Sequence, residues 1–227
     1  MKLIKIAAAA ATGILLSTGM TVAEDKPVVG LVMKSLANEF FQNMMVGAEA
    51  HAEARGDYTL IAVGMQNETD FESQINAVEN FITQGVDAIV IAPADSRAMV
   101  RPIKRAMEAG IVVVNFDVSL DAAAKEQQGI ELAFVGPDNR GGAKLAGDAL
   151  GMALGDGAKV VIIEGNPGAD NANERRLGFE ASVAEYKLDL LDSRTAHWET
   201  EEANQVFSAM LTANPNIQGV MAANDSM

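Results

Sequence analysis

The chain has 227 residues and no cysteine, so it has neither disulfide bonds nor thiolate metal ligands. Its formal net charge of -14 argues against nucleic acid as a partner, because a phosphate backbone requires a cationic protein surface. The two histidines, His51 and His197, fall on different predicted elements. We therefore expect no histidine-based metal centre.

The first residues have the pattern of a secretory signal peptide. Lys2 and Lys5 precede an apolar run over residues 6–16, and small residues end at Ala23. That run is about half the roughly 20 residues that a membrane-spanning helix needs, so a cleaved leader is favoured over an anchor. We expect residues 1–23 to be removed, with cleavage near Ala23, and the mature chain to be exported as a soluble protein.

The next segment predicts a strand, a loop and a helix. An unbroken apolar run over residues 28–33 is typical of a strand buried on both faces. A helical period follows at Phe41, Met44, Met45 and Ala48. Residues 34–41 are then the loop at the carboxyl end of a parallel strand, where open α/β sheets bind ligands. The loop has no glycine-rich phosphate-binding motif and suits a neutral polyol better than a dinucleotide, so we expect no cofactor.

The chain then repeats a strand–helix unit. Further strands are expected at 58–63, 87–91 and 111–116, and helices at 71–82 and 99–107. Thr69 and Glu72 have the spacing of a capping box, and Ser96 is expected to cap the helix that follows the third strand. A glycine ends each helix directly before a strand, at positions 56, 85 and 110. The alternation predicts a parallel sheet.

A second domain is expected after Gly136-Pro137, because proline cannot continue a central strand. Before it, residues 121–128 have no clear period and are interpreted as an exposed connection that leads to a strand at 131–135. The predicted domains are 27–135 and 136–227. In the second, helices at 138–154, 171–186 and 200–212 alternate with strands at 159–164, 188–193 and 217–222. Residues 224–227 begin another loop, so we expect this domain to be incomplete and the sequence to be part of a longer protein.

Several short motifs occur in a characteristic order. They are Lys-Ser-Leu-Ala-Asn-Glu-Phe-Phe at 34–41, Ala-Pro-Ala-Asp-Ser at 92–96, Val-Asn-Phe-Asp at 114–117, Asp-Asn-Arg-Gly-Gly-Ala at 138–143, Ile-Ile-Glu-Gly at 162–165, Asn-Glu-Arg-Arg-Leu-Gly-Phe at 173–179 and Ala-Asn-Asp-Ser-Met at 223–227. Together they make the chain from Val28 to Met227 resemble the periplasmic sugar-binding proteins of ABC transporters, of the ribose/allose/galactose class. In its first-loop lysine, Lys34, and in Trp198, the chain resembles the allose binders more than the ribose binder.

This resemblance implies an α/β fold of two doubly wound parallel-sheet domains joined by a hinge. It also implies a sugar in the cleft between them, a periplasmic location and delivery to a membrane permease by a monomer. The ligand contacts implied are Lys34, Asn38, Phe40, Phe41, Asp117, Asn171, Asn173, Arg175, Trp198 and Asn224. Ribose binders carry arginine where this chain has Val118 and Asn173, so pentose, hexose and sugar alcohol all stay open.

The proposed contacts have a chemical logic. Asp117 would accept hydrogen bonds from two neighbouring hydroxyl groups, while Lys34 and Arg175 would donate to oxygens and balance its charge. Phe40 and Trp198 are the candidates for stacking on a sugar ring. Structural alternatives are core packing for Phe41 and helix capping for Asp117 and the three asparagines at positions 38, 171 and 224.

Three other functions are alternatives to sugar binding. An exported sugar or nucleoside hydrolase would need a nucleophile–base pair or two opposed carboxylates, and the predicted cleft has one clear carboxylate, Asp117. The effector domain of a transcription repressor would need a DNA-binding helix pair before Val28, where the predicted signal peptide lies. A receptor for a furanone signal or another small polar ligand stays open. We expect no catalytic residue and no metal site.

Overall fold

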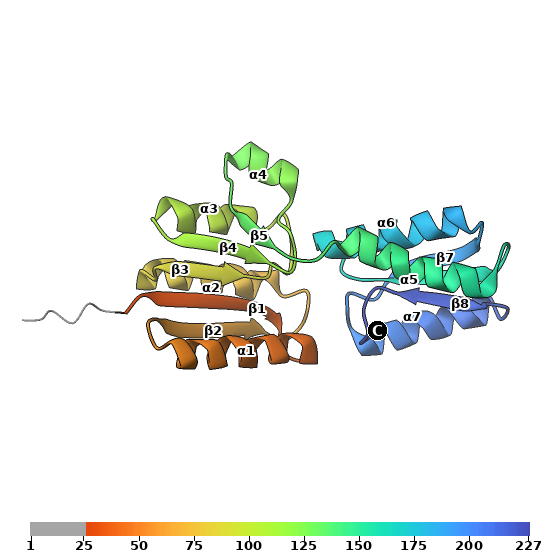
Figure 1. The fold of residues 1–227 in the computed structure, drawn as a ribbon, viewed down its shortest axis with the longest axis horizontal. Helices are drawn as coiled ribbons and strands as arrows, with labels where there is room; N and C mark the ends of the chain where they lie inside the picture. Colours follow the sequence, from red (N-terminus) through yellow and green to blue (C-terminus); the bar gives the residue numbers. More distant parts are fainter. Residues whose placement is uncertain (1–25) are drawn as a thin grey trace, which may run out of the picture.

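The structure is a computed structural model that describes residues 26–227, so the predicted signal peptide lies outside the described residues. It contains two α/β lobes (Figure 1). Among residues 26–227, no helix combines the length and the apolar character needed to cross a membrane.

The first lobe is built on a five-stranded parallel sheet in the order β2-β1-β3-β4-β5. Its strands are β1 (Val28–Ser35), β2 (Thr59–Met65), β3 (Ala88–Ile91), β4 (Val112–Phe116) and β5 (Ala133–Val135). Its helices are α1 (Glu39–Arg55), α2 (Phe71–Gln84), α3 (Val100–Glu108) and α4 (Ala122–Gln128). Because every strand is parallel, all their carboxyl ends meet at one edge of the sheet.

The second lobe has a three-stranded parallel sheet in the order β7-β6-β8. Its elements are α5 (Asn139–Leu154), β6 (Lys159–Glu164), α6 (Asp170–Glu185), β7 (Asp189–Thr195), α7 (Thr200–Ala213) and β8 (Gly219–Ala222). Figure 1 shows the chain passing from β5 to α5 between the lobes, with α5 and α6 on one face of the second sheet and α7 on the other.

The apolar pattern of β1 explains its central place. Val32 packs into a cluster with α2 and α3, whereas Leu31 and Met33 pack on the opposite face with Phe41 of α1. The prediction of a strand buried on both faces is therefore confirmed. The predicted helical stripe is confirmed as well, since Met44 joins Phe41 in the same cluster.

The glycines behave as predicted at the helix ends. Gly56 and Gly85 adopt left-handed φ values of 62° and 68°, and each ends a helix shortly before the next strand begins. A side chain would strain this backbone conformation, whereas glycine adopts it readily.

Several local predictions were wrong. Residues 122–128 form α4 instead of an irregular connection, because Asp121 Oδ1 accepts a hydrogen bond from Ala124 N and caps the helix. The capping box is absent. Asp70 Oδ1 caps α2 by accepting from Ser73 N, and the hydroxyl of Thr69 bonds Asn67 instead.

Two further corrections bear on the site. β1 runs to Ser35, so Lys34 belongs to the strand and not to the loop. Ser96 does not cap α3, whose first residue is Val100; the turn before it is held by Asp95 Oδ1, which accepts from the backbone N–H groups of Arg97 and Ala98.

Candidate functional site

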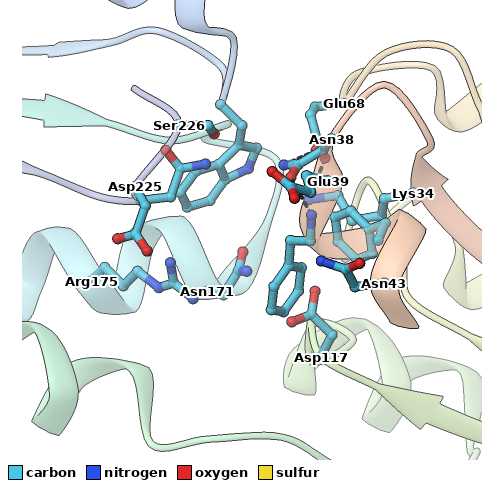
Figure 2. A pocket seen from close by; sticks show the side chains of 14 residues that line it. Lys34, Asn38, Glu39, Asn43, Glu68, Asp117, Asn171, Arg175, Asp225 and Ser226 are labelled. Carbon is cyan, nitrogen blue, oxygen red and sulfur yellow. Dashed lines mark hydrogen bonds and ion pairs between the residues drawn. The ribbon is translucent and has the colours of Figure 1, made fainter. Parts of the chain in front are cut away.

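A cavity of about 460 Å³ lies between the two lobes (Figure 2). From the first lobe it is lined by Lys34, Asn38, Glu39, Phe40, Phe41, Asn43, Glu68 and Asp117. From the second lobe it is lined by Asn171, Arg175, Trp198, Asn224, Asp225 and Ser226. The lining comes from the carboxyl ends of strands and from the first two turns of helices, which is where open α/β sheets bind ligands.

The cavity is lined by all but one of the residues that the sequence analysis gave as expected ligand contacts. Asn173 is the exception. Its amide nitrogen donates to the carbonyl oxygens of Pro167 and Ala169 at 3.0 and 3.4 Å, within its own lobe. It lies two positions after Asn171, which places it on another side of α6, and it is not among the residues that line the cavity.

Lys34 lies on the cavity wall in a buried ion pair. Its Nζ is 3.0 Å from Glu68 Oε2, and the two side chains are 3% and 2% exposed. The other oxygen, Glu68 Oε1, accepts from Asn38 Nδ2 at 3.0 Å. Burial of either charge alone would be costly, so Glu68 compensates Lys34 and also holds Asn38.

Lys34 is positioned by the buried side chain of Gln74 as well. Gln74 Nε2 donates to Met33 O and Ala92 O at 3.0 and 2.8 Å, and its Oε1 accepts from Ala94 N at 2.7 Å. These three bonds join the carboxyl ends of β1 and β3. The position of Lys34 on the cavity wall is therefore tied to the loop after β3.

Asp117 projects into the cavity from the loop after β4. Its φ of 61° is left-handed, a conformation that aspartate tolerates better than most residues. Asn115 fixes this loop, because its Nδ2 donates to Val118 O at 2.7 Å and its Oδ1 accepts from Leu120 N at 3.0 Å. Burial raises the pKa of Asp117, while the nearby charges of Lys34 and Arg175 act in the opposite direction.

Arg175 reaches the cavity from the second turn of α6. Its Nε donates to Asn139 Oδ1 at 2.8 Å, and its Nη1 donates to Ala223 O at 2.7 Å. Burial lowers the pKa of Arg175, while the nearby carboxylates of Asp117 and Asp225 act in the opposite direction. Figure 2 shows Arg175 and Asn171 projecting from α6 toward the first lobe.

Trp198 forms one wall of the cavity and part of the core of the second lobe. The left-handed φ values of His197 and Trp198, 49° and 71°, turn the indole inward, and it is only 5% exposed. A Cβ on Gly165 would lie 2.2 Å from the indole ring, so Gly165 leaves the space that the ring occupies. Lys34 Nζ and the Arg175 guanidinium carbon each lie 5.5 Å from the ring centroid, a cation–π distance.

Two buried polar atoms on the second-lobe wall are unsatisfied. Trp198 Nε1 and Asn171 Oδ1 have no hydrogen-bond partner among the described residues. A buried unpaired donor or acceptor is costly, so both atoms are candidates for contact with a ligand. The first needs an acceptor and the second a donor, and a hydroxyl group can be either.

The aromatic and amide groups of the first lobe divide between packing and the cavity. Phe41 is buried in the core and Phe40 is 53% exposed, and their rings form an edge-to-face pair at 5.1 Å. Asn38 caps α1 by accepting from Phe40 N at 3.0 Å, as the sequence suggested. In the second lobe, Asn224 Oδ1 accepts from Met227 N instead of capping a helix of the described residues.

Five lining residues were not predicted from the sequence: Glu39, Asn43, Glu68, Asp225 and Ser226. The expectation of a single carboxylate was therefore wrong. Glu68 had a signal that could have been used, since it lies in the polar stretch directly after β2, at the same sheet edge as Lys34. Glu68 also contacts the other lobe, because its backbone N–H donates to Glu199 Oε1 at 3.1 Å.

Residues 29–227 match the family described as "Periplasmic binding protein domain". The chain belongs to this family. Among curated relatives, the D-ribose/D-allose-binding protein of Pseudomonas aeruginosa is 46% identical over 204 residues, which are 89% of this chain and 64% of the relative. The D-allose-binding periplasmic protein of Escherichia coli is 33% identical over 229 residues, covering 100% of this chain and 72% of the relative. This chain thus spans about two thirds to three quarters of these relatives' length.

Solved structures show the same fold. An ABC transporter solute-binding protein from Burkholderia multivorans has a TM-score of 0.87 and 42% identity, and the match covers 88% of this chain and 71% of that one. A periplasmic solute-binding protein from Actinobacillus succinogenes with bound D-allose has a TM-score of 0.81 and 42% identity, covering 88% and 70%. The predicted fold class and the predicted resemblance to ribose/allose-type binding proteins are confirmed.

Proposed function

We propose that this protein captures an uncharged monosaccharide or sugar alcohol between its two lobes and delivers it to the permease of an ABC transporter. The observation that carries the proposal is the cavity itself. Both lobes line it, and its second-lobe wall holds a buried donor and a buried acceptor without partners among the described residues. A ligand rich in hydroxyl groups can satisfy both.

The charges on the cavity wall favour an uncharged ligand. Lys34 is matched by Glu68, and Arg175 faces Asp117. The remaining carboxylates, Glu39 and Asp225, are exposed at the rim and would repel anions. A sugar acid or sugar phosphate would therefore bring a charge that this site does not compensate.

The groups present are sufficient for tight binding. Micromolar affinity requires about -8 kcal/mol. Charge-assisted hydrogen bonds of about 1.5–3 kcal/mol each, together with aromatic contacts to the C–H face of a sugar, reach that value after ordering costs. Asp117 would accept from a pair of hydroxyl groups, and the aromatic contacts would come from Phe40 and Trp198.

Among sugars, we propose an allose- or ribose-like aldose first. Relatives with 46% and 33% identity are named for binding D-ribose/D-allose and D-allose, and a structure with 42% identity holds D-allose. Discrimination would arise because a missing or inverted hydroxyl group leaves a buried protein group unpaired. A furanone signal or another small polar ligand is the alternative ligand class.

Capture would proceed by hinge closure. A sugar bound to one lobe stabilises the closed form through its contacts with the other lobe. We propose the division between the lobes at residues 135 and 136, and a monomeric protein that reaches the periplasm after cleavage near Ala23. The closed form would be the one that the permease recognises.

A sugar or nucleoside hydrolase is the less favoured alternative, although the cavity has more carboxylates than expected. Of the two buried ones, Glu68 is held by Lys34 and Asn38, which leaves Asp117 without an opposed partner. Incubation of the protein with aryl glycosides and nucleosides separates the functions, because a binding protein returns them unchanged.

The proposal is tested by thermal shift and titration calorimetry with D-allose, D-ribose, D-arabinose and glycerol, and with D-glucuronate as the anionic control. We expect at least one neutral ligand to bind and glucuronate to have no effect. At a concentration of 100 times Kd, a ligand stabilises the folded state by about 2.7 kcal/mol. Asn171→Ala should weaken binding, whereas Asn80→Ala, on the exposed surface of α2, should not. Binding of glucuronate but no neutral ligand would overturn the proposal.

A further inference from the structure

Two loops from different lobes contact each other beside the cavity. They are residues 94–96, after β3, and residues 166–169, before α6. Ser96 N donates to Gly168 O at 2.9 Å, and Asn166 Nδ2 donates to Ala94 O at 3.3 Å. The approach is close, because a Cβ on Gly168 would lie 2.5 Å from Asp95 Oδ2.

The hydroxyl group of Ser96 forms a hydrogen bond with the N-terminus of a helix in the opposite lobe. Ser96 Oγ accepts from Asp170 N, the first residue of α6, at 2.8 Å. The N-cap position of α6 is Ala169, which has no side-chain acceptor. The first N–H groups of a helix have no partner within the helix, so Ser96 supplies across the interface what a capping side chain normally supplies locally.

Ser96 is itself held rigidly. The residue is 5% exposed, and its carbonyl oxygen accepts from Asp121 N at 3.0 Å. The turn that carries it is fixed by Asp95, which leaves the Ser96 hydroxyl free of α3. The acceptor is therefore presented to α6 by a preorganised loop of the first lobe.

The capped end of α6 is also the end that contributes to the cavity. Asn171 directly follows Asp170, and Arg175 lies about one turn further along. We infer that Ser96 is a positioning residue: it caps α6 only when the lobes are closed, and it thereby holds Asn171 and Arg175 in their ligand-binding orientation. This inference rests on the proposed function, because it assigns Ser96 a part in ligand retention without contact with the ligand.

The test compares Ser96→Ala with Ser96→Thr, which keeps the hydroxyl group, and with Ser208→Ala, the same change at an exposed position of α7. D-allose and D-ribose are the probes, with stopped-flow association and dissociation as one readout and amide hydrogen exchange as the other. We expect Ser96→Ala to raise the dissociation rate about fivefold with little change in the association rate. In the presence of sugar, the backbone amides of residues 170–173 should exchange faster in Ser96→Ala than in the wild type. Ser96→Thr should stay close to the wild type in both the dissociation rate and the amide exchange.

The outcomes separate the two proposals. If the wild type binds a sugar and Ser96→Ala keeps the same dissociation rate and the same exchange at residues 170–173, the inference is overturned. The inference is also overturned if Ser96→Thr raises the dissociation rate and the amide exchange as much as Ser96→Ala does. The hydroxyl group would then not be the group that holds α6. If the wild type binds none of the sugars, the proposed function fails. The inference rests on that function and then fails with it, whereas the two preceding outcomes overturn the inference alone.

Discussion

Lys34 and Glu68 form an ion pair of 3.0 Å that is almost fully shielded from solvent on the wall of the cavity. Each compensates the other, so the loss of one partner leaves a buried charge. We expect Glu68→Gln, which can still accept from Asn38, to destabilise the protein by about 3–5 kcal/mol. Urea denaturation of the sugar-free protein measures this change.

The double variant Lys34→Met/Glu68→Gln is the matched control. It removes both charges, so it should recover most of the stability lost in Glu68→Gln while still failing to bind sugar. A double variant as unstable as the single one would show that Glu68 acts through something other than its pairing with Lys34.

Asp117→Asn should separate stability from binding. Burial raises the pKa of Asp117, so the folded protein holds an extra proton between pH 4, near the ordinary pKa, and the raised value. Stability therefore falls as pH rises through that window, and the charged carboxylate is a net cost at neutral pH. The sugar-free variant should be more stable than the wild type at pH 7, and asparagine also tolerates the left-handed backbone.

The stability difference should shrink as pH falls and disappear below about pH 4, where Asp117 is protonated in both states. Sugar affinity should fall at least tenfold at pH 7, because a neutral amide accepts more weakly than a carboxylate. Thermal unfolding at several pH values, with and without D-allose, gives both quantities. A difference that grows toward low pH would contradict this assignment.

Gly165→Ala should displace Trp198. The added Cβ would lie 2.2 Å from the indole, so the ring must move from the cavity wall. Trp198 is the one tryptophan of the sequence, and its fluorescence maximum reports the move directly. We expect a shifted maximum and at least tenfold weaker sugar binding.

Gly47→Ala is the control for that change. Gly47 lies exposed within α1, and a Cβ there meets nothing within 4 Å. It should stabilise the protein by about 0.5–1 kcal/mol through helix propensity and leave Trp198 fluorescence unchanged. An unshifted spectrum in Gly165→Ala would mean that the indole is not packed against this glycine.

Gln74→Leu should weaken both the fold and the site. The substitution leaves Met33 O, Ala92 O and Ala94 N without their side-chain partner, at about 1–3 kcal/mol for an unsatisfied buried group. Gln84→Leu makes the same change on the exposed end of α2 and should stay within about 0.5 kcal/mol of the wild type. Equal stability of the two variants, measured by urea denaturation, would contradict the role assigned to Gln74.

Local chemistry explains most of what could be predicted. The apolar run of β1 and the left-handed glycines at helix ends depend on neighbours in sequence, so their elements were found within a few residues. The structure of short polar segments was harder to predict from the sequence. The helix at residues 122–128 depends on one capping bond from Asp121, and Asp70 replaced Thr69 as the cap of α2 because several nearby side chains compete for the same N–H groups.

The sequence by itself determined the alternation of strands and helices. With it came the two sheet edges where Lys34 and Asp117, in the first lobe, and Trp198, in the second, were expected. This follows because parallel strands bring their carboxyl ends together whatever their order. Only the tertiary structure decided which side chains pair there. Glu68 joins Lys34 across two strands, and Ser96 caps a helix of the other lobe, since partners distant in sequence leave no local pattern to read.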